Sequence, residues 1–166
     1  AYAPGSTYKI PIALAGLRAG LDEKSFSCYG GVQYGDKYMR CWIAEKKRTH
    51  GKLSLEDAIK VSCNAYFYQF GNAAGIEQIV AIGNMLGLGQ KSGIPISGES
   101  PGVLPGPEWL NNINPRARWS NGLTANTAIG QGDVGVMPQI SPFLAITARR
   151  GAKGINLGPR LRREPR

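Results

Sequence analysis

Residues 4–17 read Pro-Gly-Ser-Thr-Tyr-Lys-Ile-Pro-Ile-Ala-Leu-Ala-Gly-Leu, and this stretch carries the clearest helix pattern near the start of the chain. Its apolar residues recur at the i, i+3, i+4, i+7 spacing of one buried helix face, so we expect a helix that ends near Gly20. Ser6 then lies at the start of this helix. Lys9 lies one turn further along the same face, where its amine can reach the serine hydroxyl.

This serine and lysine have the chemistry of an activated nucleophile. A serine must lose its proton to react, and a lysine can accept that proton if burial or neighbouring groups lower its pKa. The free backbone N–H groups at a helix start can also stabilise a developing oxyanion. Taken alone, the tetrapeptide S-x-x-K arises easily by chance, and an N-cap serine beside a solvated lysine is its simpler explanation.

A second polar motif, Ser62-Cys63-Asn64, falls between two expected helices. At such a position a hydroxyl and an amide can project into a cleft instead of capping their own backbone. The two motifs together, in this order, match the pattern P-G-S-T-x-K followed by S-x-N that is typical of penicillin-recognising serine acyltransferases. The joint pattern therefore favours a catalytic role over a structural one.

Helical patterns dominate the rest of the chain. Ser54 followed by Asp57 is a capping pattern before an apolar stripe, which predicts a helix that runs towards Ser62. Gly87 and Gly89 predict a helix end. We also expect a buried helix around residues 66–70, a helix over 75–86, a long ordered loop over 89–115, a short helix over 126–129 and a longer helix over 139–150.

The three cysteines raise the question of a disulfide or a metal site. The turn signal at residues 34–36 lies midway between Cys28 and Cys41, so the segment between them has hairpin character. These two cysteines can therefore face each other, as a disulfide or as two reduced thiols. The three cysteines, Cys63 included, show no C-x-x-C spacing, and His50 is the only histidine that could join them as a metal ligand. Both facts argue against a zinc site.

Length and composition exclude several classes of protein. A chain of 166 residues with 42% hydrophobic and 19% charged residues is long and apolar enough for one globular unit and is not typical of a disordered one. We find no signal peptide and no apolar run long enough to span a membrane. Of the net charge of +9, residues 149–166 carry +6. We expect a solvated basic tail, because no nucleic-acid recognition motif accompanies it.

The sequence resembles the transpeptidase domain of class B penicillin-binding proteins, in particular the penicillin-binding protein 2 (elongation) type. The resemblance covers roughly residues 1–150, with the matching pieces in the family's order. These pieces are residues 2–9, Cys41-Trp42 with His50-Gly51, residues 58–68, residues 93–99 with 102–105, Trp109 and residues 126–132.

This resemblance implies an α+β fold of the penicillin-binding-protein transpeptidase and serine β-lactamase-like type. The chain would hold the helix-rich part, with residues 1–150 as a partial transpeptidase domain, a basic tail of little order over 151–166, and most of the antiparallel sheet missing. It implies that Ser6 is the acylated nucleophile, that Lys9 is its base, that Ser62 relays a proton to the leaving group and that Asn64 holds the substrate amide. No cofactor or metal is implied.

The implied function is that of a D,D-transpeptidase of peptidoglycan synthesis, acylated by the D-Ala-D-Ala stem peptide or by penicillin. The implied partners are stem peptides, β-lactam antibiotics and, for the parent protein, a glycosyltransferase of cell-wall elongation; nucleic acid is not among them. The implied location is the periplasmic face of the bacterial inner membrane, with the anchor outside this chain. A β-lactam sensor domain and a serine β-lactamase are the alternatives, and Asn64 favours the transpeptidase.

Two features depart from the family pattern. The third motif, K-T-G or K-S-G on an edge strand, is expected well after residues 129–132, and the chain ends without it. Residues 91–93 spell Lys-Ser-Gly, but we interpret them as a loop turn because they directly precede residues 94–99 in a neighbourhood without strand signals. Residues 136–139 also differ from the family's usual residues around the proline. The activity of the isolated piece is therefore a separate question from that of its parent.

Overall fold

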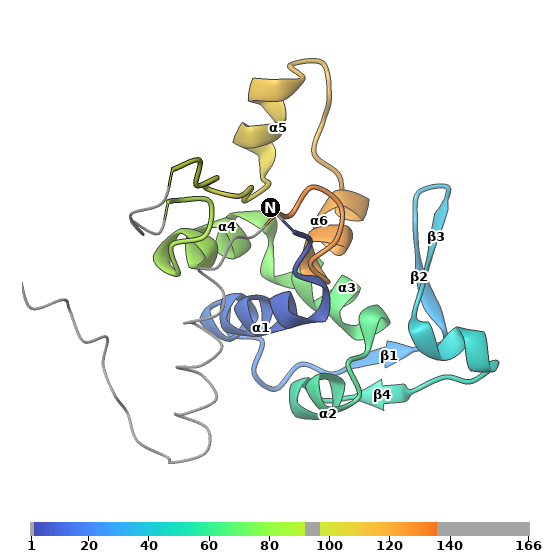
Figure 1. Cartoon of the computed structure of the whole chain (residues 1–166). Coiled ribbons are helices and arrows are strands. Elements are labelled where there is room, and N and C mark those ends of the chain that lie inside the picture. The colour runs from blue at the N-terminus through green and yellow to red at the C-terminus, as the bar shows by residue number, and fades with distance from the viewer. Residues whose placement is uncertain (1, 92–96, 136–166) are drawn as a thin grey trace, which may run out of the picture.

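The computed structural model describes residues 2–91 and 97–135. The chain enters through a short 3-10 helix, η1, and continues directly into the first α-helix (Figure 1). The elements are η1 (Gly5–Tyr8), α1 (Lys9–Arg18), β1 (Phe26–Cys28), β2 (Gly31–Tyr34), β3 (Lys37–Arg40), η2 (Trp42–Lys46), β4 (Gly51–Leu53), α2 (Leu55–Lys60), α3 (Asn64–Ala74), α4 (Ile76–Met85), α5 (Pro107–Ile113) and α6 (Asn121–Ala128).

Helix α3 forms the centre of the described structure, because α1, α4, α6, β1 and β2 all pack against it. Its aromatic side chains Tyr66, Phe67 and Phe70 are fully buried and contact one another through their rings. The Phe70 ring lies against the backbone of α1 at Gly16, where any Cβ would overlap the ring. This close approach of α1 to α3 brings the start of α1 beside the start of α3.

The strands form two separate antiparallel pairs within the described residues. Strands β2 and β3 make the predicted hairpin, with Tyr34 opposite Lys37, and Figure 1 shows it standing out to one side of the helices. Strands β1 and β4 pair so that Cys28 lies opposite Gly51, a pairing that the sequence analysis did not predict. Short antiparallel strands beside a helical core agree with the helix-rich α+β fold that the resemblance implied.

Most of the predicted helix ends are confirmed. The Ser54 hydroxyl accepts a hydrogen bond from the backbone N–H of Asp57 and caps α2, as the capping pattern predicted. Helix α4 ends before Gly87, whose φ of +75° favours glycine.

Two predicted segments need correction. The expected loop over 89–115 contains α5, which begins with Pro107 at its first position and has Glu108 in its first turn. Helix α6 begins at Asn121, earlier than expected, because the Ser120 hydroxyl caps it by accepting from the backbone N–H of Leu123 at 3.3 Å.

Residues 92–96 and 136–166 lie outside the described residues, and with them the expected helix over 139–150, the departure at 136–139 and the basic tail. Over the residues that the structure does describe, none of the helices combines the length and the apolar character needed to cross a bilayer.

Candidate active site and thiol cluster

The predicted nucleophile, Ser6, lies in the 3-10 turn directly before α1 and is exposed. Two hydrogen bonds to backbone carbonyl oxygens hold this turn. The Gly5 N–H donates to the Gly130 carbonyl oxygen at 2.9 Å, and the Thr7 hydroxyl donates to the Pro4 carbonyl oxygen at 2.8 Å. Gly130 has a φ of +67°, and a Cβ there would overlap the Gly5 carbonyl oxygen. The segment after α6 therefore supports the turn that carries the serine.

The side chain of Lys9 is buried and reaches both predicted motifs. Its Nζ lies 3.2 Å from the Ser6 Oγ, the proximity that the S-x-x-K spacing predicted. The same nitrogen donates to the Ser62 Oγ at 2.9 Å and to the Ser62 carbonyl oxygen at 2.8 Å, and it contacts the Asn64 Oδ1 at 2.7 Å. It also lies 5.6 Å from the centre of the Phe67 ring. The structure thus brings all four predicted site residues around one amine.

Burial lowers the pKa of Lys9 from 10.5 to about 8, although the nearby sulfur atoms of Cys41 and Cys63 oppose the shift. The four oxygen contacts come from neutral groups, so none of them replaces the solvation of a full positive charge. A pKa near 8 leaves about one tenth of the amines neutral at pH 7. A neutral amine at this position can accept a proton from the serine hydroxyl.

Ser62 has a backbone conformation that L residues rarely adopt, with a φ of +51°. It follows the end of α2 and lies two residues before the first residue of α3. The indole N–H of Trp42 lies 3.2 Å from the carbonyl oxygen of Ser62 and 3.2 Å from that of Val61. Trp42 is one of the residues that carry the family resemblance, but the sequence indicates no role for it. Its contact with Ser62 depends on the tertiary fold.

Behind the S-x-N segment lies a cluster of soft ligand atoms. The sulfur atoms of Cys28, Cys41 and Cys63 and a ring nitrogen of His50 all lie within 4.8 Å of one another. The Cys41 Sγ is 3.9 Å from the Cys63 Sγ and 3.7 Å from the His50 Nδ1. Three thiols and an imidazole at this spacing form a donor set that can hold Zn²⁺.

The sequence left two alternatives open for Cys28 and Cys41, and the structure has the reduced one, since all three cysteines are free thiols. The expectation against a zinc site rested on the spacing of the cysteines along the chain. Here the four side chains come from separate segments, and the pairing of β1 with β4 places His50 near Cys28.

The thiols of Cys41 and Cys63 lie in contact, with 3.9 Å between their sulfur atoms. The pKa of the Cys41 thiol is held well below its usual value, mainly by a hydrogen bond from Cys63. The same hydrogen bond and burial raise the pKa of the Cys63 thiol. The backbone N–H groups of Ala65, Ile43 and Asn64 also favour a thiolate at Cys41. Within the cluster, Cys41 is therefore the thiol whose surroundings most favour the thiolate.

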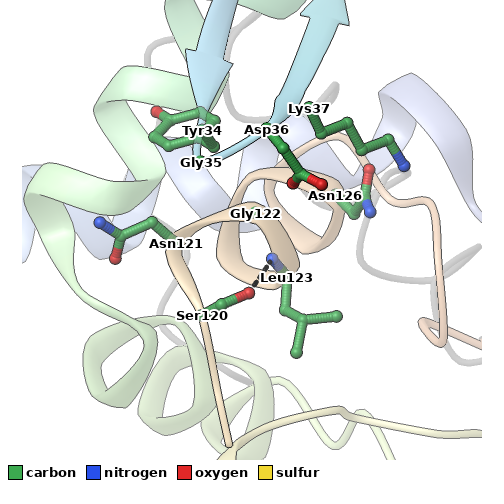
Figure 2. A pocket seen from close by; sticks show the side chains of 9 residues that line it. All are labelled: Tyr34, Gly35, Asp36, Lys37, Ser120, Asn121, Gly122, Leu123 and Asn126. Carbon is green, nitrogen blue, oxygen red and sulfur yellow. Dashed lines mark hydrogen bonds between the residues drawn. The ribbon is translucent and has the colours of Figure 1, made fainter.

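An open pocket of about 460 Å³ lies where the hairpin meets α6. Figure 2 shows the hairpin turn beside the first turns of α6, with the Asp36 carboxylate directed toward that helix. The hairpin and α6 are each hydrogen-bonded to α3. The Tyr34 hydroxyl of the hairpin donates to the Tyr68 carbonyl oxygen at 3.0 Å, and the Asn72 amide of α3 donates to the Asn121 carbonyl oxygen of α6 at 3.1 Å. None of the four predicted site residues lines this pocket.

Comparison with known proteins identifies the family of this chain. The family model for the penicillin binding protein transpeptidase domain matches residues 1–151. The chain is similar to peptidoglycan D,D-transpeptidase MrdA of Acinetobacter baumannii, with 35% identity over 156 residues that cover 91% of this chain and 23% of the relative. It is similar to stage V sporulation protein D of Bacillus subtilis, with 33% identity over 89% of this chain and 21% of that protein. The chain thus spans about a quarter of the length of these relatives.

Solved structures give the same result for the fold. PBP2 of Pseudomonas aeruginosa, in complex with WCK 5153, has a TM-score of 0.79 and 34% identity, covering 90% of this chain and 34% of that one. PBP2 of Helicobacter pylori, in complex with MreC, has a TM-score of 0.75 and 31% identity, covering 84% of this chain and 26% of that one. The expected resemblance and fold are therefore confirmed.

Proposed function

The chain belongs to the penicillin-binding protein transpeptidase family, and on this basis we propose that it is part of a D,D-transpeptidase that cross-links peptidoglycan. The substrate is the D-Ala-D-Ala end of a stem peptide, and penicillin acylates the same serine. The observation that carries this proposal is the position of one buried amine within hydrogen-bond distance of two hydroxyls and an amide oxygen.

In the first half-reaction, the Ser6 Oγ attacks the carbonyl carbon of the penultimate D-Ala. Lys9 accepts the serine proton over the 3.2 Å that separates Nζ from Oγ. The peptide C–N bond then breaks, and the terminal D-Ala leaves with a proton that Ser62 delivers from Lys9, 2.9 Å away. An ester between the Ser6 oxygen and the stem peptide remains.

In the second half-reaction, an acceptor amine attacks this ester, its proton passes back through Ser62 and Lys9, and the Ser6 hydroxyl is restored. Asn64 holds the substrate amide through its side chain, which the contact between Oδ1 and Lys9 Nζ orients. No cofactor takes part in either step, because proton transfer and one covalent ester balance the reaction.

The test is acylation of the full-length protein by a fluorescent penicillin, followed by mapping of the labelled peptide. We expect label on Ser6 and none in Ser6→Ala, with Ser25→Ala as a matched control that keeps full labelling. Label on Ser62, or label that survives in Ser6→Ala, would contradict the proposal. Rapid hydrolysis of the penicillin ester would identify a serine β-lactamase instead, and a stable ester without any peptide turnover would identify a sensor.

For the parent protein we propose membrane attachment, with this site on the periplasmic side, and action beside a glycosyltransferase of cell-wall elongation. A peptidoglycan synthase complex that coordinates polymerization and crosslinking, 30% identical to this chain with a TM-score of 0.75, supports this partner class. The Helicobacter pylori PBP2 in complex with MreC shows that a relative also binds another protein. Co-purification of the full-length protein with such a glycosyltransferase tests the proposal.

A further inference from the structure

The pocket where the hairpin meets α6 borders the segment that supports the nucleophile. Asn126, in the last turn of α6, lines this pocket. Its carbonyl oxygen accepts a hydrogen bond from the Gln131 N–H at 3.0 Å, and the carbonyl oxygen of the adjacent Gly130 accepts from the Gly5 N–H at 2.9 Å. Gly5 directly precedes Ser6. The pocket is therefore placed to receive a part of the substrate that lies a short way from the reacting carbonyl.

Two opposite charges line this pocket. Asp36 lies in the hairpin turn and Lys37 begins β3, and both side chains are exposed. Figure 2 shows the Asp36 carboxylate directed toward α6 and the Lys37 side chain extending away from Asp36. Across residues 2–91 and 97–135, neither side chain has a hydrogen-bond or ion-pair partner. The acid and the base are thus both available to a ligand.

The backbone that carries the acid and the base is fixed before any ligand binds. Gly35 has a φ of +58°, which favours glycine, and its carbonyl oxygen accepts from the Gln33 side-chain amide at 2.7 Å. The bond from the Tyr34 hydroxyl to α3 holds the whole turn beside α6. A preorganised turn of this kind loses less conformational entropy when it binds a ligand.

The other lining residues indicate what the ligand contains. Tyr34 and Leu123 contribute apolar surface. The side-chain amides of Asn121 and Asn126 can each donate and accept hydrogen bonds. A ligand that uses the acid, the base and the amides carries an ammonium and a carboxylate together on a short carbon stem. An α-amino acid group at the end of a side chain has this chemistry, whereas a lone amine leaves the base without a partner.

The proposed reaction supplies such a group. Its acceptor amine comes from a side chain of a second stem peptide, so stem peptides contain a diamino acid, and on the donor peptide that side chain is not consumed. Building on the proposed function, we propose that this pocket binds the side-chain end of the donor's diamino acid and selects one with a carboxylate on the same carbon as the amine. Asp36 accepts hydrogen bonds from the ammonium, and Lys37 donates to the carboxylate. These are specificity-determining residues, and no covalent bond changes in the pocket.

The first experiment compares three peptides on the full-length protein with its unaltered sequence. All end in D-Ala-D-Ala and differ in the preceding residue: lysine, lysine with a carboxylate added on the carbon that bears the side-chain amine, or norleucine, which lacks that amine. We expect kcat/KM for release of the terminal D-Ala to be highest with the carboxylate. It should fall roughly 3- to 10-fold on losing the carboxylate and again on losing the amine, since water partly screens charge pairs in an open pocket. Equal values for the three peptides would overturn the proposal.

Charge variants assign each half of the selection to one residue. Lys37→Glu should remove or reverse the preference for the carboxylate-bearing peptide over the lysine peptide, because like charges repel. Asp36→Asn should remove the preference for lysine over norleucine. Lys52→Glu makes the same change of charge at an exposed residue of β4 outside the pocket, and it should keep the original ranking.

Each ranking compares peptides on one protein sample, so a partly misfolded variant cannot imitate the expected result. An unchanged ranking in both pocket variants would overturn the proposal. So would a preference that does not weaken at high salt, since exposed charge pairs are screened.

Penicillin separates failure of this inference from failure of the proposed function, because it needs only the site around Ser6. Labelling of Ser6 in the unaltered protein, together with equal turnover of the three peptides, would keep the transpeptidase function and overturn this inference. A protein that penicillin never labels and that releases D-Ala from none of the peptides would overturn the proposed function itself. Labelling of Ser6 with the expected ranking would support both.

Discussion

Two regions meet at residues 62–64, and they stabilise charge in opposite ways. On one side, the Lys9 amine is surrounded by oxygen atoms of hydroxyl, carbonyl and amide groups. On the other side, three sulfur atoms and an imidazole nitrogen crowd together, and one sulfur already favours the thiolate. Neutral oxygens do not fully replace water around a cation, so burial lowers the pKa of the lysine to about 8.

This difference bears on how residues 62–64 are held. In the proposed reaction the hydrogen bonds on the lysine side rearrange during proton transfer, whereas the buried thiols on the other side take no part in it. The left-handed Ser62 lies between them. The region proposed to move protons thus packs against a buried cluster that does not, and the following changes separate the two contributions.

The largest effect is expected from Lys9→Arg, which keeps the positive charge but removes the base. A guanidinium does not give up its proton, so penicillin acylation of the full-length protein should fall by about 100- to 10,000-fold. Lys60→Arg, at the exposed end of α2, is the control and should behave like the original protein. Retained acylation in Lys9→Arg would mean that the lysine acts only through its charge.

The pH dependence of acylation tests the state of the same amine. Lys9 must be neutral to accept a proton, so the acylation rate should rise with pH to a plateau above about 8 and fall about tenfold per unit below it. Between about 8 and 10.5 the unfolded chain binds a proton that the folded chain does not, so the free energy of unfolding should rise with pH there. A rate profile that is flat from pH 6 to 9, measured by stopped-flow labelling, would contradict this assignment.

Gly130→Ala should disturb the lysine side alone. The new Cβ would overlap the Gly5 carbonyl oxygen, and the φ of +67° disfavours any L side chain. We expect a loss of about 1–3 kcal/mol in the free energy of unfolding and slower acylation, since the turn that carries Ser6 must shift. Gly122→Ala in α6 has space for its Cβ and should not destabilise the protein. Equal stability of the two variants in urea denaturation would show that the Ser6 turn does not depend on Gly130.

The smallest effect is expected from Trp42→Phe, which removes only the indole N–H that contacts Val61 and Ser62. This bond lies at the partly exposed junction of the two regions, so the loss should be about 0.5–1.5 kcal/mol of stability. Acylation should slow by a few-fold. A variant with the original acylation rate would indicate that this contact does not help to position Ser62.

Much of the helical structure could be predicted because its signals are local. The Ser54 cap, the glycine after α4 and the S-x-x-K spacing all act within one or two helical turns. Helix α5 was missed because glycine and proline residues around it predict a loop. The pairing of β1 with β4 was missed because each strand has three residues and their partners lie far apart in the chain.

The closeness of Ser6 and Lys9 could be predicted from the sequence, because α-helical and 3-10 turns alike place residues i and i+3 on the same side. The family could also be predicted, since several separate motifs occur in one order. The contact of Lys9 with Ser62 and Asn64 could not, because it depends on α1 packing against α3 at Gly16 and Phe70. Only the tertiary structure brought Cys28, Cys41, His50 and Cys63 together, since no local rule relates side chains from four segments that meet only when the core is packed.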